Sequence, residues 1–260
     1  MSRVSATLAC LGCLFFAAFT EVSATVIPFE FRDGLIWVKI AAAGAQAPLN
    51  FLLDSGAGST VLSADASARL QVPIGKPTSV QRVGAGVAAF RARDFQASLG
   101  GIAVSRTPLV LDLSHTSSFC CRAIDGLIGQ DFLRDRVVQI NFKTSTIRLL
   151  DRAEADEGAI VMKLKTANAA FCVALSVNGA SPKWTRLDTG CDDGLHWVGS
   201  GETASRSSVQ LGKELLTNVK TAWHRSQIFP DEAGLLGNGV LSNYLVTIDA
   251  VKGRLLLRRI

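Results

Sequence analysis

The sequence predicts an all-β fold built as two similar lobes, and an internal repeat is the main evidence. When residues 126–129 (GLIG) are laid on residues 234–237 (GLLG) and both are read forward without a gap, apolar residues coincide to the end of the chain. Short β-branched or aromatic runs bounded by turn formers make up most of each half. We therefore expect two β lobes with one architecture.

The expected elements follow these patterns in chain order. Strands are expected at residues 36–40, 137–142 and 244–248, where the runs are β-branched or aromatic. Brief helices are expected at 64–70, 130–134 and 239–243. An alternating apolar run that ends in glycine, at 35–44 and again at 171–179, precedes a proline in each half. Each proline stands six positions before an aspartate, Asp54 or Asp188, so the repeat extends through both halves.

The lobes are expected to meet in the acidic stretch 151–158, which suits a solvated linker. We assign residues 25–152 to an N-terminal lobe and residues 153–260 to a C-terminal lobe. The copies are unequal, because 75 positions separate Asp54 from Gly129 and only 49 separate Asp188 from Gly237. The second lobe is therefore expected to lack about 26 residues between these landmarks.

Residues 1–24 are interpreted as a signal peptide. Arg3 precedes an apolar run over 4–19, and small residues at 22–24 suit cleavage. An uncleaved membrane anchor is the alternative, but the run is shorter than the roughly 20 residues that a spanning helix needs. We expect export, either periplasmic or extracellular, with no stable membrane insertion after cleavage.

Composition and charge indicate which kinds of binding partner to expect. The 260 residues are 48% hydrophobic, which supports a substantial core, and the net charge of +5 is dispersed. The one dense basic group, at 254–259, has no interleaved aromatic residues, so nucleic-acid binding is not expected.

Four cysteines follow the expected signal peptide, and after export one or two disulfides among them are expected, with pairing left open. These are Cys120, Cys121, Cys172 and Cys191. Neither their spacing nor the three scattered histidines suits a zinc site, so no metal is expected.

Two short cassettes carry the candidate chemistry, because Asp54 and Asp188 each follow an apolar run. A hydroxyl residue and a glycine come next: Ser55 and Gly56 in the first cassette, Thr189 and Gly190 in the second. The apolar run predicts a buried strand that carries the carboxylate to the floor of a cleft. The hydroxyl can bond across to the other loop, and glycine lets a backbone amide approach the carboxylate.

Two carboxyl groups held this close cannot both ionise, so they share one proton. The charged member can take a proton from water while the neutral member polarises a carbonyl, and no cofactor is needed. One such triplet alone is typical of an ordinary turn, so the prediction depends on both copies. Because the pair titrates as a unit, the sequence does not assign the proton to either aspartate.

The chain resembles the retropepsin-like aspartic proteases, with two tandem half-domains. The resemblance rests on residues 54–57 and 127–129 in the first half and on 188–190 and 235–237 in the second. It implies an all-β, two-lobed, acid-protease-like barrel pair with an interlobe cleft. It also implies that Asp54 and Asp188 are the catalytic acids of an aspartic endopeptidase, that Ser55 and Thr189 interlock the loops, and that a peptide or protein is the substrate.

The family also carries a flap, a β-hairpin that closes over the substrate. Residues 80–99 fit this pattern, and an ordinary glycine-rich surface hairpin is the alternative. The flexible turn, with a role in substrate binding, is expected at Val83, Gly84, Ala85 and Gly86. The matching stretch of the second half, 200–219, is shorter and lacks such a glycine pair, so one flap is expected.

The second cassette departs from the family at Cys191, Asp192 and Asp193, where small or hydroxyl residues are usual. Neither Ala57 nor Cys191 offers a hydroxyl to its aspartate, and losing a hydrogen bond to the charged form raises a pKa. We therefore expect an activity optimum less acidic than that of pepsin.

Three alternatives concern the function, the oligomeric state and the mechanism. A catalytically silent module that binds peptides or a protein partner is the alternative function. The second cassette removes the need for a partner chain, so a monomer is expected. A histidine-dependent mechanism is disfavoured, because no nucleophile signature accompanies His115, His196 or His224.

Overall fold

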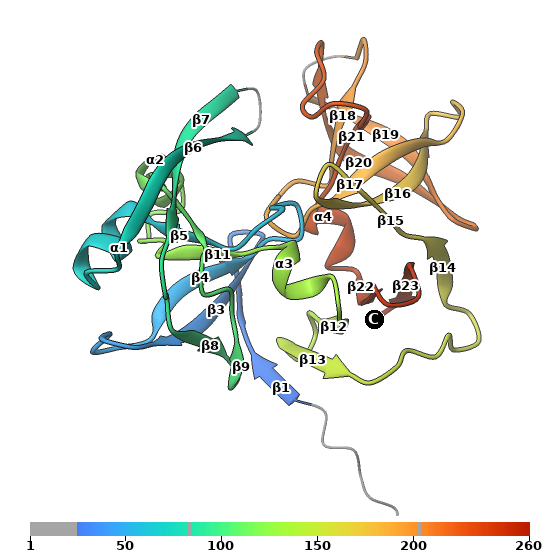
Figure 1. Cartoon of the computed structure of the whole chain (residues 1–260). Helices are drawn as coiled ribbons and strands as arrows, with labels where there is room; N and C mark the ends of the chain where they lie inside the picture. The colour runs from blue at the N-terminus through green and yellow to red at the C-terminus, as the bar shows by residue number, and fades with distance from the viewer. Residues whose placement is uncertain (1–24, 83–84, 202–203) are drawn as a thin grey trace, which may run out of the picture.

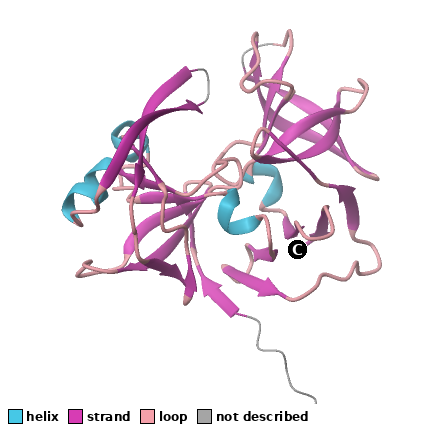
Figure 2. Cartoon of the chain, viewed as in Figure 1, coloured by secondary structure: helices cyan, strands magenta, loops and turns pink. Residues whose placement is uncertain are grey.

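The computed structural model describes residues 25–82, 85–201 and 204–260. Within these ranges the chain is almost entirely strands and loops, with a few helices of one or two turns (Figure 2). Two β lobes stand side by side above a sheet that joins them (Figure 1). The all-β, two-lobed fold class predicted from the sequence is confirmed.

The first lobe is a ten-stranded sheet in which β2 (Glu30–Arg32) pairs with β3. The other strands lie in the order β6 (Ile74–Arg82), β7 (Ala85–Ala92), β10 (Leu109–Leu111), β5 (Val61–Ser63), β11 (Gly126–Ile128), β4 (Leu49–Leu53), β3 (Leu35–Ala42), β8 (Ala97–Leu99) and β9 (Ile102–Ala103). Its helices are α1 (Ala64–Arg69), α2 (Ser114–Phe119) and α3 (Gln130–Leu133).

The second lobe is a seven-stranded sheet that closes on itself, because β16 also pairs with β19. Its order is β15 (Lys165–Ala167), β16 (Ala170–Val177), β17 (Lys183–Leu187), β21 (Gly234–Leu236), β18 (Leu195–Val198), β20 (Glu214–His224) and β19 (Ala204–Leu211). Helix α4 (Asn238–Leu241) follows β21, as α3 follows β11.

A third sheet of six strands joins the lobes. Its order is β1 (Thr25–Pro28), β13 (Thr146–Leu150), β12 (Val137–Asn141), β22 (Tyr244–Asp249), β23 (Arg254–Arg259) and β14 (Ile160–Lys163). The two central strands, β12 and β22, occupy matching places in the repeat and pair antiparallel, with Ile140 opposite Val246. The halves are therefore related across the middle of this sheet.

Of the three apolar clusters in the described part of the molecule, two are large. The larger runs through both lobes and includes Leu53, Leu187 and Ile140, so the strands that lead to the aspartates are fixed in one continuous core. The smaller lies on the other face of the first lobe's sheet and includes Leu52, Val61 and Leu111. Residues of the β6–β7 hairpin pack against this smaller cluster.

The hairpin expected at 80–99 exists but is placed differently. It runs from Ile74 in β6 to Ala92 in β7, and Gly86 lies within β7 instead of in the turn. Residues 97–99 form β8, which pairs with β3 and does not belong to the hairpin. Val83 and Gly84 lie outside the described residues, and only the backbone of Ala85 is described.

The second lobe has no described counterpart of α1 or of the β6–β7 hairpin. After β18 the chain passes to β19, which pairs with β20 in the place that the first lobe gives to β8 and β9. The residues that the second half lacks between Asp188 and Gly237, as the sequence predicted, therefore correspond mainly to α1 and the β6–β7 hairpin of the first lobe.

The predicted disulfides are absent, because all four cysteines outside residues 1–24 are free thiols. Cys120 ends α2 and its neighbour Cys121 is exposed, while Cys172 lies within β16 and Cys191 in the loop after Gly190. Three of these thiols are buried on separate elements, so apolar packing accounts for them.

In the part of the chain that the structure describes, no helix has the length and apolar character needed to cross a bilayer. The expected signal peptide, including Cys10 and Cys13, lies outside the described residues, so it stays a prediction.

Candidate active site

Two equivalent strand pairs carry the aspartates to the same point. β4 runs parallel to β11 and ends at Leu53, just before Asp54; β17 runs parallel to β21 and ends at Leu187, just before Asp188. The Asp54 amide donates to the Ile128 carbonyl at 2.9 Å, and the Asp188 amide donates to the Leu236 carbonyl at 3.0 Å. The apolar run before each aspartate is thus a buried strand, as predicted.

The glycine that ends the GLIG or GLLG motif in each half, Gly129 or Gly237, lies directly against the backbone of the loop that follows the aspartate. A Cβ on Gly129 would lie 2.4 Å from the Ser59 carbonyl carbon, and one on Gly237 would lie 2.3 Å from the Asp193 carbonyl oxygen. Any larger residue would push the loop that follows the aspartate out of place. This contact explains why the GLIG and GLLG motifs recur at matching positions in the repeat.

The structure brings Asp54 and Asp188 together, as the sequence predicted. The two half-buried carboxyl groups lie close enough for each to affect the pKa of the other. Each also lies against the glycine of the opposite loop: a Cβ on Gly56 would stand 2.5 Å from the Asp188 Cγ. Only glycine leaves room for a carboxyl group at this position.

Ser55 and Thr189 lock the loops together reciprocally. The Ser55 amide donates to the Thr189 Oγ1 at 2.9 Å, and the Thr189 amide donates to the Ser55 Oγ at 3.1 Å. Each hydroxyl then donates at 2.8 Å to a strand carbonyl of the other lobe, Ser55 to Leu187 and Thr189 to Leu53. These buried bonds fix the distance between the two aspartates.

The two carboxyl groups have unequal backbone support. Asp54 Oδ1 accepts the Gly56 and Ala57 amides, both at 2.9 Å, whereas Asp188 Oδ1 accepts only the Gly190 amide, at 2.9 Å. The Cys191 amide donates to the Asp188 main-chain carbonyl at 3.3 Å, as the Ala57 amide does to that of Asp54 at 3.2 Å, but it makes no bond to the Asp188 side chain. The charged form of Asp54 is therefore the better stabilised.

Burial raises the pKa of both aspartates. For Asp54 burial raises the pKa, and the hydrogen bond from the Ala57 amide lowers it and so cancels part of the effect of burial. For Asp188 the neighbouring charge of Asp54 adds to burial, and its pKa is raised well above the usual range. Because two like charges this close disfavour each other, the pair favours a state in which one acid is charged and the other holds the proton.

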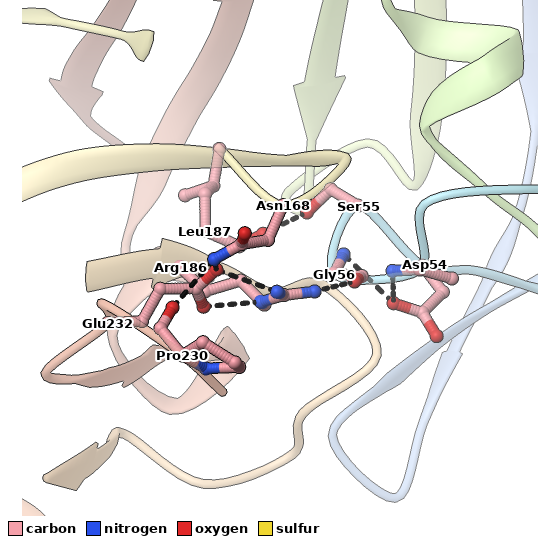
Figure 3. A network of polar contacts seen from close by, with 9 residues as sticks. Asp54, Ser55, Gly56, Asn168, Arg186, Leu187, Pro230 and Glu232 are labelled. Carbon is pink, nitrogen blue, oxygen red and sulfur yellow. Dashed lines mark hydrogen bonds and ion pairs between the residues drawn. The ribbon is translucent and has the colours of Figure 1, made fainter. Parts of the chain in front are cut away.

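Sequence reasoning missed a buried ion pair beside the aspartates. Arg186 and Glu232, whose side chains are 4% and 2% exposed, form two hydrogen bonds of 2.7 Å (Figure 3). The only signal in the sequence is an arginine inside the apolar run before Asp188. Its partner lies 46 residues away, so no local pattern links them.

Of the two acids that follow Cys191, one is paired with cationic partners and the other is exposed. Asp193 accepts from Lys220 at 2.6 Å and from His196 at 3.2 Å, so its pKa is lowered by these partners against the effect of burial. Asp192 is exposed and packs against Gly34. Burial raises the pKa of Cys191, which keeps its thiol neutral.

His196 and His224 form a pair on the second lobe, with Nδ1 of the first 2.9 Å from Nε2 of the second. The strand registers place them where the first lobe has the apolar residues Val61 and Leu111. Among residues 25–82, 85–201 and 204–260, no group of three or more side chains could hold a metal ion.

Comparisons with known proteins found one similar family and a similar fold. A family described as "gag-polyprotein putative aspartyl protease" matches residues 40–135, which include the Asp54 cassette and Gly129. The crystal structure of an aspartic proteinase from Irpex lacteus superposes with a TM-score of 0.59 at 10% identity, covering 91% of this chain and 97% of that one. None of the curated proteins compared matches this chain.

At this level of identity the structural match shows the fold alone, while the family match covers most of the first lobe. The resemblance to retropepsin-like aspartic proteases is therefore confirmed, in sequence over residues 40–135 and in fold over nearly the whole chain.

Proposed function

We propose that this protein is an aspartic endopeptidase that hydrolyses peptide bonds with a water held between Asp54 and Asp188. One observation carries the proposal: two carboxyl groups from equivalent loops lie together, and each packs against the glycine of the other loop. Two carboxyl groups with raised pKa values at one point are typical of a catalytic site, in which one acid keeps its proton while the other acts as a base.

In the proposed reaction the charged carboxylate removes a proton from water as the water oxygen attacks the scissile carbonyl carbon. The neutral carboxyl group donates its hydrogen bond to the carbonyl oxygen and stabilises the charge that develops there. A proton then passes to the amide nitrogen, the C–N bond breaks, and the shared proton is restored. The protein forms no covalent intermediate.

The substrate in this proposal is an extended segment of a peptide or protein, bound partly through backbone hydrogen bonds. The β6–β7 hairpin of the first lobe would act as the flap, since the second lobe has no described equivalent. The enzyme would be exported, and it would work as a monomer because one chain supplies both aspartates.

The direct test is incubation of purified protein with a denatured protein substrate from about pH 3 to 7, with and without pepstatin. Asp54→Asn and Asp188→Asn should each abolish cleavage. Asp192→Asn is the matched control, because this exposed aspartate lies in the same loop but outside the pair. Binding of the substrate without cleavage at any pH would instead favour the silent binding module.

A further inference from the structure

Arg186 lies two residues before Asp188, in the strand that delivers it. The guanidinium is held from two sides: Glu232 takes Nε and Nη2, and the Phe229 ring lies 3.6 Å from Cζ. Glu232 also faces the Asn168 amide, which donates to the Pro230 carbonyl at 2.6 Å. The arginine is therefore fixed in one buried position.

The remaining guanidinium nitrogen reaches into the other lobe. Arg186 Nη1 donates to the Gly56 carbonyl oxygen at 2.6 Å (Figure 3). That carbonyl belongs to the same peptide group as the Ala57 amide, which donates to Asp54 Oδ1 at 2.9 Å. One peptide group thus has a buried cation at its oxygen and an acid at its N–H.

A cation on the carbonyl oxygen polarises this peptide group and makes its N–H a stronger donor. Hydrogen bonds in such a chain strengthen one another, most of all where water is excluded. The Ala57 amide should therefore favour the charged form of Asp54 beyond what an ordinary amide would achieve.

Asp188 has no such chain. The strand registers place Leu52, which is apolar, in the first lobe where Arg186 stands in the second, since these residues pair with Leu127 and Leu235 respectively. The Ala57 and Cys191 amides both contact the main-chain carbonyl of their own aspartate, at 3.2 and 3.3 Å, but of the two only the Ala57 amide also donates to the aspartate side chain. The cation thus acts on one acid of an otherwise symmetric pair.

We propose that Arg186, held by Glu232, is a positioning residue that sets the order of the two acids: Asp54 carries the charge and accepts the proton of water, and Asp188 carries the shared proton. This inference rests on the proposed function, yet the location of the proton can be measured without any cleavage.

Electrostatics agree with this order. The charge of Arg186 lowers the pKa of both aspartates, while the pKa of Asp188 is raised well above its usual range by burial and by the charge of Asp54. For Asp54 the hydrogen bond from the Ala57 amide lowers the pKa more than the charge of Arg186 does, which makes the directed hydrogen bond the main route of influence.

The test is a ¹³C carboxyl NMR titration of the two single-acid variants, Asp188→Asn and Asp54→Asn, each with and without Arg186→Leu. Leucine is chosen because the first lobe carries it at this position. Asp54 should titrate about one pH unit or more below Asp188, a tenfold or greater difference in proton affinity. Arg186→Leu should raise the midpoint of Asp54 more than that of Asp188. Equal midpoints, the reverse order or equal shifts would overturn the proposal.

Glu232→Gln gives an independent check if Arg186→Leu does not fold. It keeps the arginine and removes its counter-charge, so the Asp54 midpoint should move down, opposite to the effect of Arg186→Leu. An unchanged or raised midpoint would contradict the proposed role.

The pH dependence of kcat/KM distinguishes this role from a purely structural one. In Arg186→Leu the acid limb of the pH profile of kcat/KM should shift to higher pH, whereas general loosening would lower kcat and leave the limb in place. If the wild-type protein cleaves nothing, the proposed function fails. The NMR midpoints of Asp54 and Asp188 still test the role of Arg186, because they do not depend on cleavage.

Discussion

Gly190 and Asp54 face each other across the lobes, and a Cβ on this glycine would lie 2.5 Å from the Asp54 Cγ. The same relation holds between Gly56 and Asp188, so each loop forms one wall of the site for the other loop's acid. The spacing of the two carboxyl groups is thus set by two glycines as much as by the aspartates themselves.

Replacing either glycine should therefore damage catalysis more than folding. In Gly190→Ala the new methyl group must displace the Asp54 carboxyl group, and a displacement of about 1 Å costs on the order of 100-fold in rate. We expect kcat/KM to fall by about this factor, with thermal unfolding close to wild type. Gly56→Ala should behave alike, and wild-type activity in either variant would show that the carboxyl spacing is not constrained as described.

The hydroxyl interlock should contribute to stability. Thr189→Val keeps the shape of the side chain but leaves the buried Ser55 amide and Leu53 carbonyl without their partner. An unsatisfied buried group costs about 1–3 kcal/mol, so urea unfolding should show a loss of at least this size. Thr189→Ser retains the hydroxyl and serves as the matched control. Equal unfolding free energies for the two variants would contradict an energetic role for the interlock.

The raised pKa of Asp188 has a consequence for stability. A carboxyl group whose folded pKa lies above its unfolded value of 3.8 stabilises the fold below that value, and the contribution is lost as pH rises through the folded pKa. Asparagine carries no charge at any pH. Asp188→Asn should therefore unfold at higher urea concentration than wild type at pH 7, by a margin that shrinks as pH falls toward 3.8. A variant less stable than wild type at pH 7 would argue against a strained charge pair.

The His196–His224 pair predicts a loss of stability in mild acid. Its 2.9 Å N···N contact needs a proton on one ring and a lone pair on the other, and Asp193 and Lys220 are the charged groups beside it. Burial, and then the charge of His196, lowers the pKa of His224 below 6.5. The unfolded chain therefore binds the proton first, and stability falls as pH drops below 6.5 toward the folded pKa.

His224→Leu, which restores the residue type of the first lobe, should reduce this acid-dependent loss relative to wild type. The measurement is the free energy of unfolding between about pH 7 and 5. Exposed His115→Leu is the control and should follow the wild-type curve. A His224→Leu curve parallel to wild type over this range would exclude the pair as the source.

Much of the fold and the centre of the site could be predicted because their signals are local and occur twice. Asp54 and Asp188 are marked by the residues beside them, and Gly129 and Gly237 by their place in the repeat. Helix α2 gave no such signal: Leu113 at its start makes no capping bond with its side chain, and its serine-rich sequence is typical of a loop.

The errors have physical causes as well. The turn of the hairpin was placed by glycine alone, although Gly86 is accommodated within β7 and the register is set by pairing with β6. Disulfides were inferred from composition, which says nothing about where side chains lie in space. The Arg186–Glu232 pair depends on two distant strands meeting, and only the folded chain shows that contact.

The six-stranded sheet shared by the two lobes determines whether the two halves of the chain could fold separately. Cutting the chain near residue 152 would leave β12 and β22 each with an open edge, the place where identical subunits commonly join. The boundary between the sequence repeats is therefore not a boundary between independent folding units. One seam of backbone hydrogen bonds between β12 and β22 makes each half of the repeat complete the sheet of the other.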